Sequence, residues 1–199
     1  MADAPIRLIV GLGNPGEPYE ETYHNAGILA VSFFESLLGL SSQKKTSGSA
    51  TLFSFPGLSI AASRTFMNRS GGAVRDLLRR VRLSPHNLLL VHDESDLPLG
   101  AFRLGFNRGA GGHHGVESVI SSLGTQAFWR LRIGIRKSGA KETGARAALR
   151  EKASRIVLKK IGPREKRALE SAFALAFERL VRQKLIAAPL LRPPQRSSA

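Results

Sequence analysis

Two short tracts near the N-terminus combine residue types that suit ligand binding: a glycine-rich tract, Gly11–Gly16, and then His24–Gly27. The first follows the apolar run Ile6–Val10, so it lies where a predicted strand ends. In open α/β sheets, ligands gather at the carboxyl ends of strands, where glycine lets the backbone approach closely. The tract also matches the G-x-G-x-x-G pattern of dinucleotide-binding loops, whose chemistry is pyrophosphate binding at a helix N-terminus.

Two prolines argue against a dinucleotide site. A pyrophosphate loop uses backbone N–H groups, whereas Pro15 has none, and Pro18 restricts the turn that follows. The acidic residue expected about twenty positions later, at the end of a second strand, is also missing. Glu35 lies instead within Ile28–Leu38, whose apolar spacing predicts a helix. We therefore expect the glycines to shape a pocket, but not one for a nicotinamide cofactor.

Further candidate site residues lie at the ends of other predicted elements. Asp93 follows directly on the apolar strand Asn87–His92, which brings it to the same sheet edge as Asn14. Asn68 precedes a predicted helix, where it could either cap that helix or contact a ligand. His24 stands at a predicted helix start, and a single histidine there is more typical of capping or packing than of catalysis. None of these residues indicates a function by itself, so any functional assignment depends on their combination.

Predicted strands and helices alternate along the chain, which is typical of an α/β fold. Strands are predicted at 6–12, 51–55, 58–62, 87–92, 101–106 and 131–135, and helices at about 25–38, 69–82, 113–122 and 164–186. Ser41–Gly48 has the composition of a polar loop, and residues 192–199 that of a disordered tail. We expect residues 1–191 to form a single domain.

The composition excludes several classes of protein. The 199 residues contain no cysteine, which excludes disulfides, thiolate metal sites and cysteine nucleophiles and fits a cytoplasmic protein. No apolar run approaches the roughly 20 residues that a membrane span needs. Since residues 1–5 are few and include an acidic residue, we expect no signal or transit peptide.

Positive charge is concentrated in the last third of the chain. Residues 1–129 hold 11 Lys/Arg and 10 Asp/Glu, whereas residues 130–199 hold 19 and 5, so this region carries +14 of the formal net charge of +15. A solvated basic face would also aid solubility. So large an excess in one region is the pattern expected for contact with a phosphate backbone, and we expect a nucleic-acid partner rather than a membrane.

Taken together, the tracts resemble the bacterial-type peptidyl-tRNA hydrolases, in the right order and spacing from about residue 6 to residue 190. That family has a single α/β domain with a mixed, mostly parallel sheet flanked by helices. It hydrolyses the ester between a peptide and tRNA, and it uses no metal or other cofactor. The tracts that carry the resemblance are Leu8–Gly16, Tyr19–Gly27, Thr65–Gly71, His92–Pro98, Gly111–Gly115 and Leu131–Ile135.

The resemblance implies a role for each residue in the cleft. His24 is the general base for water, because a histidine with a pKa of about 6.5 is available as a neutral base at cell pH. Asp93 orients the imidazole, as a carboxylate does in a serine triad. Asn14 contacts the peptide side of the ester, and Asn68 donates its amide to the substrate and the developing oxyanion. The remaining expected contacts to the tRNA end are the aromatic rings of Tyr19 and Phe66.

Three arginines are expected to hold tRNA phosphates: Arg103 and Arg108, which flank the glycine tract, and Arg136. The sequence departs from the family at His114, where an asparagine that contacts substrate and water is usual, so the role of that position is open. Tyr23 stands where an arginine commonly precedes the catalytic histidine. We expect a monomer with peptidyl-tRNA as its substrate and no obligatory protein partner.

Two other functions stay open. A non-catalytic RNA-binding protein could share this fold, because fold does not guarantee chemistry. A metal-dependent hydrolase could use histidine and carboxylate ligands, although neighbours such as His92 and Asp93 point to opposite faces of a strand. The ligands available to it are His92, Asp93, Asp96, His113 and His114.

Overall fold

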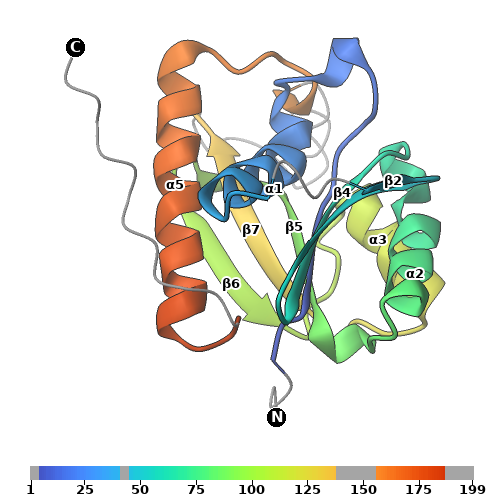
Figure 1. The fold of residues 1–199 in the computed structure, drawn as a ribbon. Coiled ribbons are helices and arrows are strands. Elements are labelled where there is room, and N and C mark those ends of the chain that lie inside the picture. Colours follow the sequence, from blue (N-terminus) through green and yellow to red (C-terminus); the bar gives the residue numbers. More distant parts are fainter. Residues whose placement is uncertain (1–4, 41–44, 138–155, 187–199) are drawn as a thin grey trace.

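The computed structural model describes residues 5–40, 45–137 and 156–186, and these residues form a seven-stranded sheet with helices on both faces (Figure 1). The strands are β1 (Leu8–Gly11), β2 (Lys45–Ser47), β3 (Ala50–Phe55), β4 (Leu58–Ser63), β5 (Leu88–Pro98), β6 (Phe102–Phe106) and β7 (Trp129–Arg136). The α-helices are α1 (Ala26–Leu37), α2 (Ser70–Arg80), α3 (His114–Leu123) and α5 (Pro163–Arg182). Short 3-10 turns lie at Glu17–Tyr19, Tyr23–Asn25, Met67–Arg69 and Pro85–Asn87.

The sheet is mixed, as predicted. Its strand order is β2-β3-β4-β1-β5-β7-β6. Strands β4, β1, β5 and β7 pair in parallel at the centre, whereas β3 and β6 run antiparallel to their neighbours. The predicted mixed, mostly parallel α/β sheet is therefore confirmed. Parallel central strands place their carboxyl ends along one edge, and that edge carries Gly11 and Asp93.

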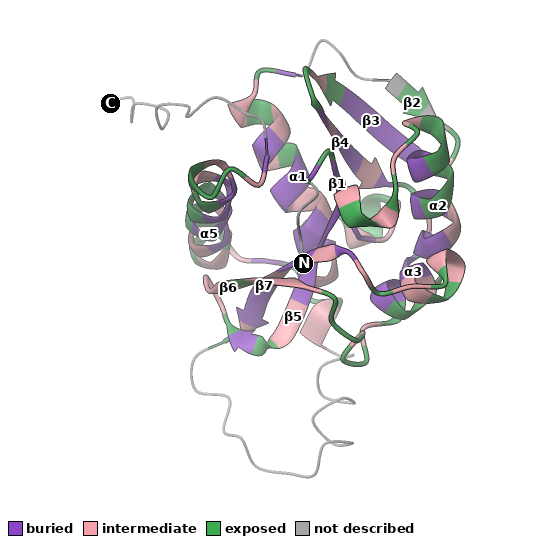
Figure 2. Ribbon diagram, turned by 90° about the horizontal axis from the view of Figure 1, so that it is seen from below, coloured by how far each residue is buried: buried purple, intermediate pink, exposed green. Residues whose placement is uncertain are grey.

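Helices α1 and α5 pack on one face of the sheet and α2 and α3 on the other (Figure 1). Strand residues alternate between the two cores: Ile9 and Leu89 face α1 and α5, while Val10 and Leu90 face α2 and α3. Because β1 and the first part of β5, Leu88–Val91, are covered on both faces, both segments lack polar side chains, and the centre of the sheet is buried (Figure 2). The buried sheet is a rigid support for the loops at its edge.

The start of α1 lies directly against the end of β1, and glycine makes this possible. A Cβ atom on Gly27 would collide with the carbonyl oxygens of Val91 and Leu12, and one on Gly11 would collide with the backbone of Gly27. Glycine at both positions lets the helix backbone touch two strands. This contact fixes the turn that precedes α1, which carries His24.

Two predicted boundaries differ from the structure. Lys45–Ser47, assigned to a polar loop, forms the edge strand β2, because an edge strand needs backbone pairing on one side only and shows little apolar alternation. Strand β5 continues from His92 to Pro98, where it pairs with β7 across a register shift. The proposed tail at 192–199 and the basic residues between 138 and 155 lie outside the described residues. Among those described, no helix is long and apolar enough to span a membrane.

Candidate active site

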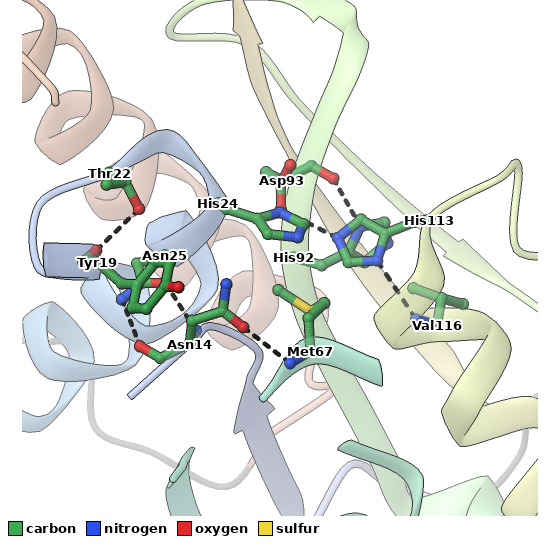
Figure 3. A network of polar contacts seen from close by, with 10 residues as sticks. All are labelled: Asn14, Tyr19, Thr22, His24, Asn25, Met67, His92, Asp93, His113 and Val116. Atoms are coloured by element: carbon green, nitrogen blue, oxygen red, sulfur yellow. Dashed lines mark hydrogen bonds and ion pairs between the residues drawn. The ribbon is translucent and has the colours of Figure 1, made fainter. Parts of the chain in front are cut away.

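Two histidines converge on one carboxylate oxygen at the carboxyl edge of the sheet (Figure 3). Asp93 lies on β5 and is 4% exposed, and its Oδ1 lies 2.9 Å from Nδ1 of His24 and 3.0 Å from Nε2 of His113. His24 comes from the turn before α1, and His113 is the residue that caps α3. Thus three separate segments meet at Asp93.

The hydrogen bond at the start of α3 fixes which nitrogen of His113 carries a hydrogen. The backbone N–H of Val116 donates to His113 Nδ1, so Nε2 bears the hydrogen and donates to Asp93. Burial alone would raise the pKa of Asp93, but the charge and hydrogen bond of His113, together with those of His24, hold it well below its usual range. The carboxylate is therefore ionised and can only accept hydrogen bonds.

The ionised Asp93 in turn defines the chemistry of His24. Nδ1 of His24 must carry the hydrogen that it donates to the carboxylate, which leaves the lone pair on Nε2. His24 is 15% exposed and lines both hollows of the site, and no described residue bonds to its Nε2. A partly exposed histidine in this tautomer, oriented by a carboxylate, can accept a proton from water.

Asn14 is held by three hydrogen bonds, none of which uses its side-chain amide nitrogen among the described residues. Its Oδ1 accepts from the backbone N–H of Met67 at 2.8 Å, and its main chain exchanges two hydrogen bonds with the side chain of Asn25. The oxygen is thereby assigned to the Met67 side, and the amide NH2 points toward His24 (Figure 3). Asn14 thus presents two N–H donors beside the base, as the sequence predicts for a substrate contact.

Two hollows meet at His24. The first, of about 470 Å³, is lined by Asn14, His24, Phe66, Met67, Asn68, Arg69 and His114. The second, of about 440 Å³, is lined by Asn14, His24, Asp93, Glu94, Ser95, Ala110–His114, Glu117, Val157 and Leu158. Phe66 is half exposed, and the ring of Tyr19 meets it edge-on with centroids 6.1 Å apart. The first hollow therefore has an aromatic wall beside the base.

The structure excludes one of the two roles considered for Asn68, the capping of α2. The N-cap position of α2 is Arg69, and no side chain caps that helix. Asn68 lies in the 3-10 turn Met67–Arg69, is exposed, and lines the first hollow. The ligand-contact role is thus the one that its position favours.

His114 begins α3 and stands at the border of the two hollows. Its side chain is 81% exposed, and its Nδ1 lies 3.2 Å from Oε2 of Glu117, one turn along the helix. The carboxylate accepts from Nδ1, so Nε2 of neutral His114 is a hydrogen-bond acceptor, whereas an asparagine would offer both a donor and an acceptor. Position 114 therefore offers different chemistry here from that of the family asparagine.

The predicted basic contacts lie on β6, in the loop that follows it, and on β7. Arg103 on β6 pairs in register with Arg132 on β7, which pairs with His92 on β5. Arg103 and Arg108 are exposed, whereas Arg136 lies at the end of β7, four residues beyond Arg132. Arg103 is thus in register with His92 two strands away, and Arg136 lies further along β7.

Sequence reasoning missed the buried member of this basic group, Arg130. Arg130 is 3% exposed, and its Nε has no hydrogen-bond partner among the described residues. It lies on β7, between β5 and the edge strand β6 that carries Arg103. Burial, with the neighbouring charges of Arg132 and Arg108, lowers its pKa to about 10. The carboxylate of Glu94, which pairs with Arg132 at 3.4 Å, offsets part of this effect.

His113 was also missed as a partner of Asp93, having been considered only as a metal ligand. Its signal in the sequence is a histidine directly before an apolar helix pattern, in a tract whose glycines allow close approach. Sequence spacing cannot show that a helix cap and a strand end twenty residues apart share one hydrogen bond. The sequence therefore indicated the correct loop, but the residue chosen there as a site residue was His114 and not His113.

The metal-site alternative is weakened by the hydrogen bonding. Among the described residues, the group with ligand atoms close enough to hold a metal ion is His24, Asp93 and His113, so the proposed ligands His92, Asp96 and His114 are not part of it. The nitrogens that face Asp93 already donate to it, and the Val116 N–H occupies the other nitrogen of His113. Their lone pairs therefore do not converge on a common point.

A histidine–carboxylate pair with amide donors, set in a cleft at the carboxyl edge of an α/β sheet, suits a hydrolase that activates water with a histidine. The comparison with known families specifies which one. The family model described as peptidyl-tRNA hydrolase matches residues 8–188, and the chain belongs to this family.

Relatives and solved structures agree. The chain is 39% identical over 197 residues to a peptidyl-tRNA hydrolase of Aquifex aeolicus, covering 91% of this chain and 99% of that protein. It is 46% identical over 136 residues to one of Thiobacillus denitrificans, covering 68% and 67%. The crystal structure of peptidyl-tRNA hydrolase from Acinetobacter baumannii superposes with a TM-score of 0.73 at 31% identity, covering 90% of this chain and 92% of that one.

Proposed function

We propose that His24 is the general base in the hydrolysis of the ester bond between a peptide and tRNA, which is the activity of the family to which the chain belongs. The observation that carries this assignment is the contact between His24 Nδ1 and the ionised Asp93, which leaves Nε2 as a base facing the cleft. Neutral Nε2 takes a proton from water as its oxygen attacks the ester carbonyl.

The remaining groups suit the later steps. As the tetrahedral intermediate forms, the amides of Asn14 and Asn68 are placed to donate to substrate oxygens, including the developing oxyanion. Asp93 stabilises the imidazolium that His24 becomes. The bond between the carbonyl carbon and the ribose oxygen then breaks, and the imidazolium returns its proton to that oxygen. The products are tRNA with a free ribose hydroxyl and the peptide acid, which releases a proton to water and becomes a carboxylate.

The surroundings of the cleft suit the two ends of such a substrate. The aromatic wall of Tyr19 and Phe66 offers a stacking surface for a terminal base. Three arginines offer contacts for nearby phosphates: Arg103 on β6, Arg108 in the loop after β6, and Arg132 on β7. Arg136, further along the edge, would contact the tRNA body. We extend the proposal to a monomer, since every group in these steps comes from one chain, and to the cytoplasm, because the proposed substrate is a tRNA.

The test is hydrolysis of N-acetyl-aminoacyl-tRNA compared with free aminoacyl-tRNA, both in excess chelator. We expect rapid release of the N-acetyl amino acid and slow release of the free one. Tight binding of the tRNA without hydrolysis would instead favour the non-catalytic RNA-binding function. Hydrolysis that chelator abolishes and added divalent metal restores would favour a metal-dependent hydrolase.

A further inference from the structure

The backbone that leads into His24 is tied to a segment far away in the sequence. Thr22 forms an antiparallel bridge with Lys160. The N–H of Tyr23 donates to the carbonyl of Lys159 at 3.3 Å, and the N–H of Ile161 donates to the carbonyl of Glu21 at 2.7 Å. The position of His24 therefore depends on residues 159–161 as well as on the sheet.

The side chain of Lys160 adds a second tie. Its Nζ donates to the carbonyl oxygens of Glu20 at 2.6 Å and Glu17 at 3.2 Å. Glu17 begins the 3-10 turn Glu17–Tyr19 and Glu20 follows it, so the ammonium group binds both ends of the turn. The carbonyl oxygen of Glu17 also accepts from the N–H of Glu20, so Lys160 adds to the hydrogen bond that closes the turn. The next residue, Glu21, has a φ of 56°, a left-handed conformation that a glutamate adopts only when its surroundings hold it there.

The same segment also reaches the catalytic cleft. Val157 and Leu158, just before Lys159, line the second hollow together with His24 and Asp93. One short segment thus borders the reacting groups and clamps the turn that carries the base. Lys160 lies at the centre of this arrangement, with its ammonium group engaged by carbonyls instead of facing solvent alone.

We propose that Lys160 is a positioning residue for His24. Its ammonium group fixes the turn at residues 17–23 and so holds the imidazole at the angle needed to take a proton from water. This inference rests on the proposed role of His24. It also separates Lys160 from the basic residues that would contact tRNA phosphates, although charge alone places it among them.

The test compares Lys160→Met with Lys160→Arg and with the matched control Lys159→Met. Lys159 is the exposed neighbour, and its side chain makes no hydrogen bond or ion pair to the described residues. Because small misplacements of a catalytic group cost up to about 100-fold in rate, we expect Lys160→Met to lower kcat by about tenfold or more. Its KM for whole tRNA and the salt dependence of KM should stay unchanged, and Lys160→Arg should recover most of kcat.

In contrast, Lys159→Met should leave kcat unchanged. If Lys160→Met instead raises KM and flattens its salt dependence at constant kcat, Lys160 is a phosphate contact and the proposal is wrong. Thermal unfolding of each variant shows whether a loss of kcat comes from a folded protein.

A readout independent of activity is the imidazole NMR signal of His24, assigned by its loss in His24→Asn. We expect this signal to shift or broaden in Lys160→Met and to stay in place in Lys159→Met. An unchanged signal in Lys160→Met would overturn the positioning role. If the wild-type protein hydrolyses no N-blocked aminoacyl-tRNA, the proposed function fails, while the NMR comparison still decides whether Lys160 positions His24.

Discussion

His113 Nε2 lies 3.0 Å from the Asp93 oxygen that also accepts from His24. The helix cap at the start of α3 fixes the tautomer of His113, which therefore always donates to the carboxylate. Asp93 thus has two donors and no freedom to rotate away from His24. The pair that we assign to catalysis is held by a helix terminus, a strand end and a turn at the same time.

Replacing Asp93 with asparagine should destabilise the protein in a pH-dependent way. Although burial raises it, the pKa of Asp93 is lowered overall by His113 and His24, so it lies below the value of about 3.9 in the unfolded chain. The ionised carboxylate therefore contributes stability above that pH, and the contribution is lost as the pH falls further. In urea unfolding, we expect wild type to exceed Asp93→Asn by on the order of 2 kcal/mol near neutral pH. A difference that stays constant into the acid range would contradict this account.

His114→Asn should preserve or raise activity at neutral pH. Asparagine restores a donor and an acceptor at the border of the two hollows, whereas neutral His114, paired with Glu117, offers an acceptor. The measurement is kcat/KM for N-acetyl-aminoacyl-tRNA, with Glu117→Gln as a companion that loosens the histidine without removing it. Complete loss of activity in His114→Asn would show that the histidine has an essential role of its own.

Arg130→Leu should make the protein more stable but a poorer enzyme. Arg130 is buried, and its Nε has no hydrogen-bond partner in the part of the chain that the structure describes. Replacing a buried charge by an apolar side chain is often stabilising, here by about 1 kcal/mol. The matched control is Arg132→Leu, which leaves Glu94 without its partner at 3.4 Å and should not stabilise. Denaturant unfolding gives the first quantity, and KM for whole tRNA, which should rise, gives the second. Lower stability of Arg130→Leu would show that the guanidinium is satisfied in the fold.

Arg103→Gln should weaken tRNA binding and reduce its salt dependence. Each phosphate contact contributes about 0.7 to 0.9 to the slope of log affinity against log salt, so the loss of one contact lowers the slope by that amount. Arg182, which pairs with Glu178 on the helix covering one face of the sheet, supplies the control variant Arg182→Gln. A minimal ester substrate without the tRNA body should respond to neither change. An unaltered slope for whole tRNA would remove Arg103 from the interface.

The sequence allowed most of the fold to be predicted because the apolar runs and glycines carry local information. Strand β5 is apolar from Leu88 to Val91. Glycine is needed at position 27 because the start of α1 touches the backbone of two neighbouring segments. The edge strand β2 has no comparable pattern. The roles of His113 and Lys160 depend on contacts between distant segments, and neither composition nor charge distinguishes a lysine that binds carbonyl groups from one that faces tRNA.

The most direct test of the catalytic assignment is single-turnover hydrolysis of N-acetyl-aminoacyl-tRNA by His24→Asn. Asparagine keeps a polar side chain beside Asp93 but cannot accept a proton from water. We expect the rate to fall by about 10²–10⁴-fold while the variant stays folded and binds tRNA with wild-type affinity. Hydrolysis by His24→Asn near the wild-type rate would contradict the assignment of His24 as the base.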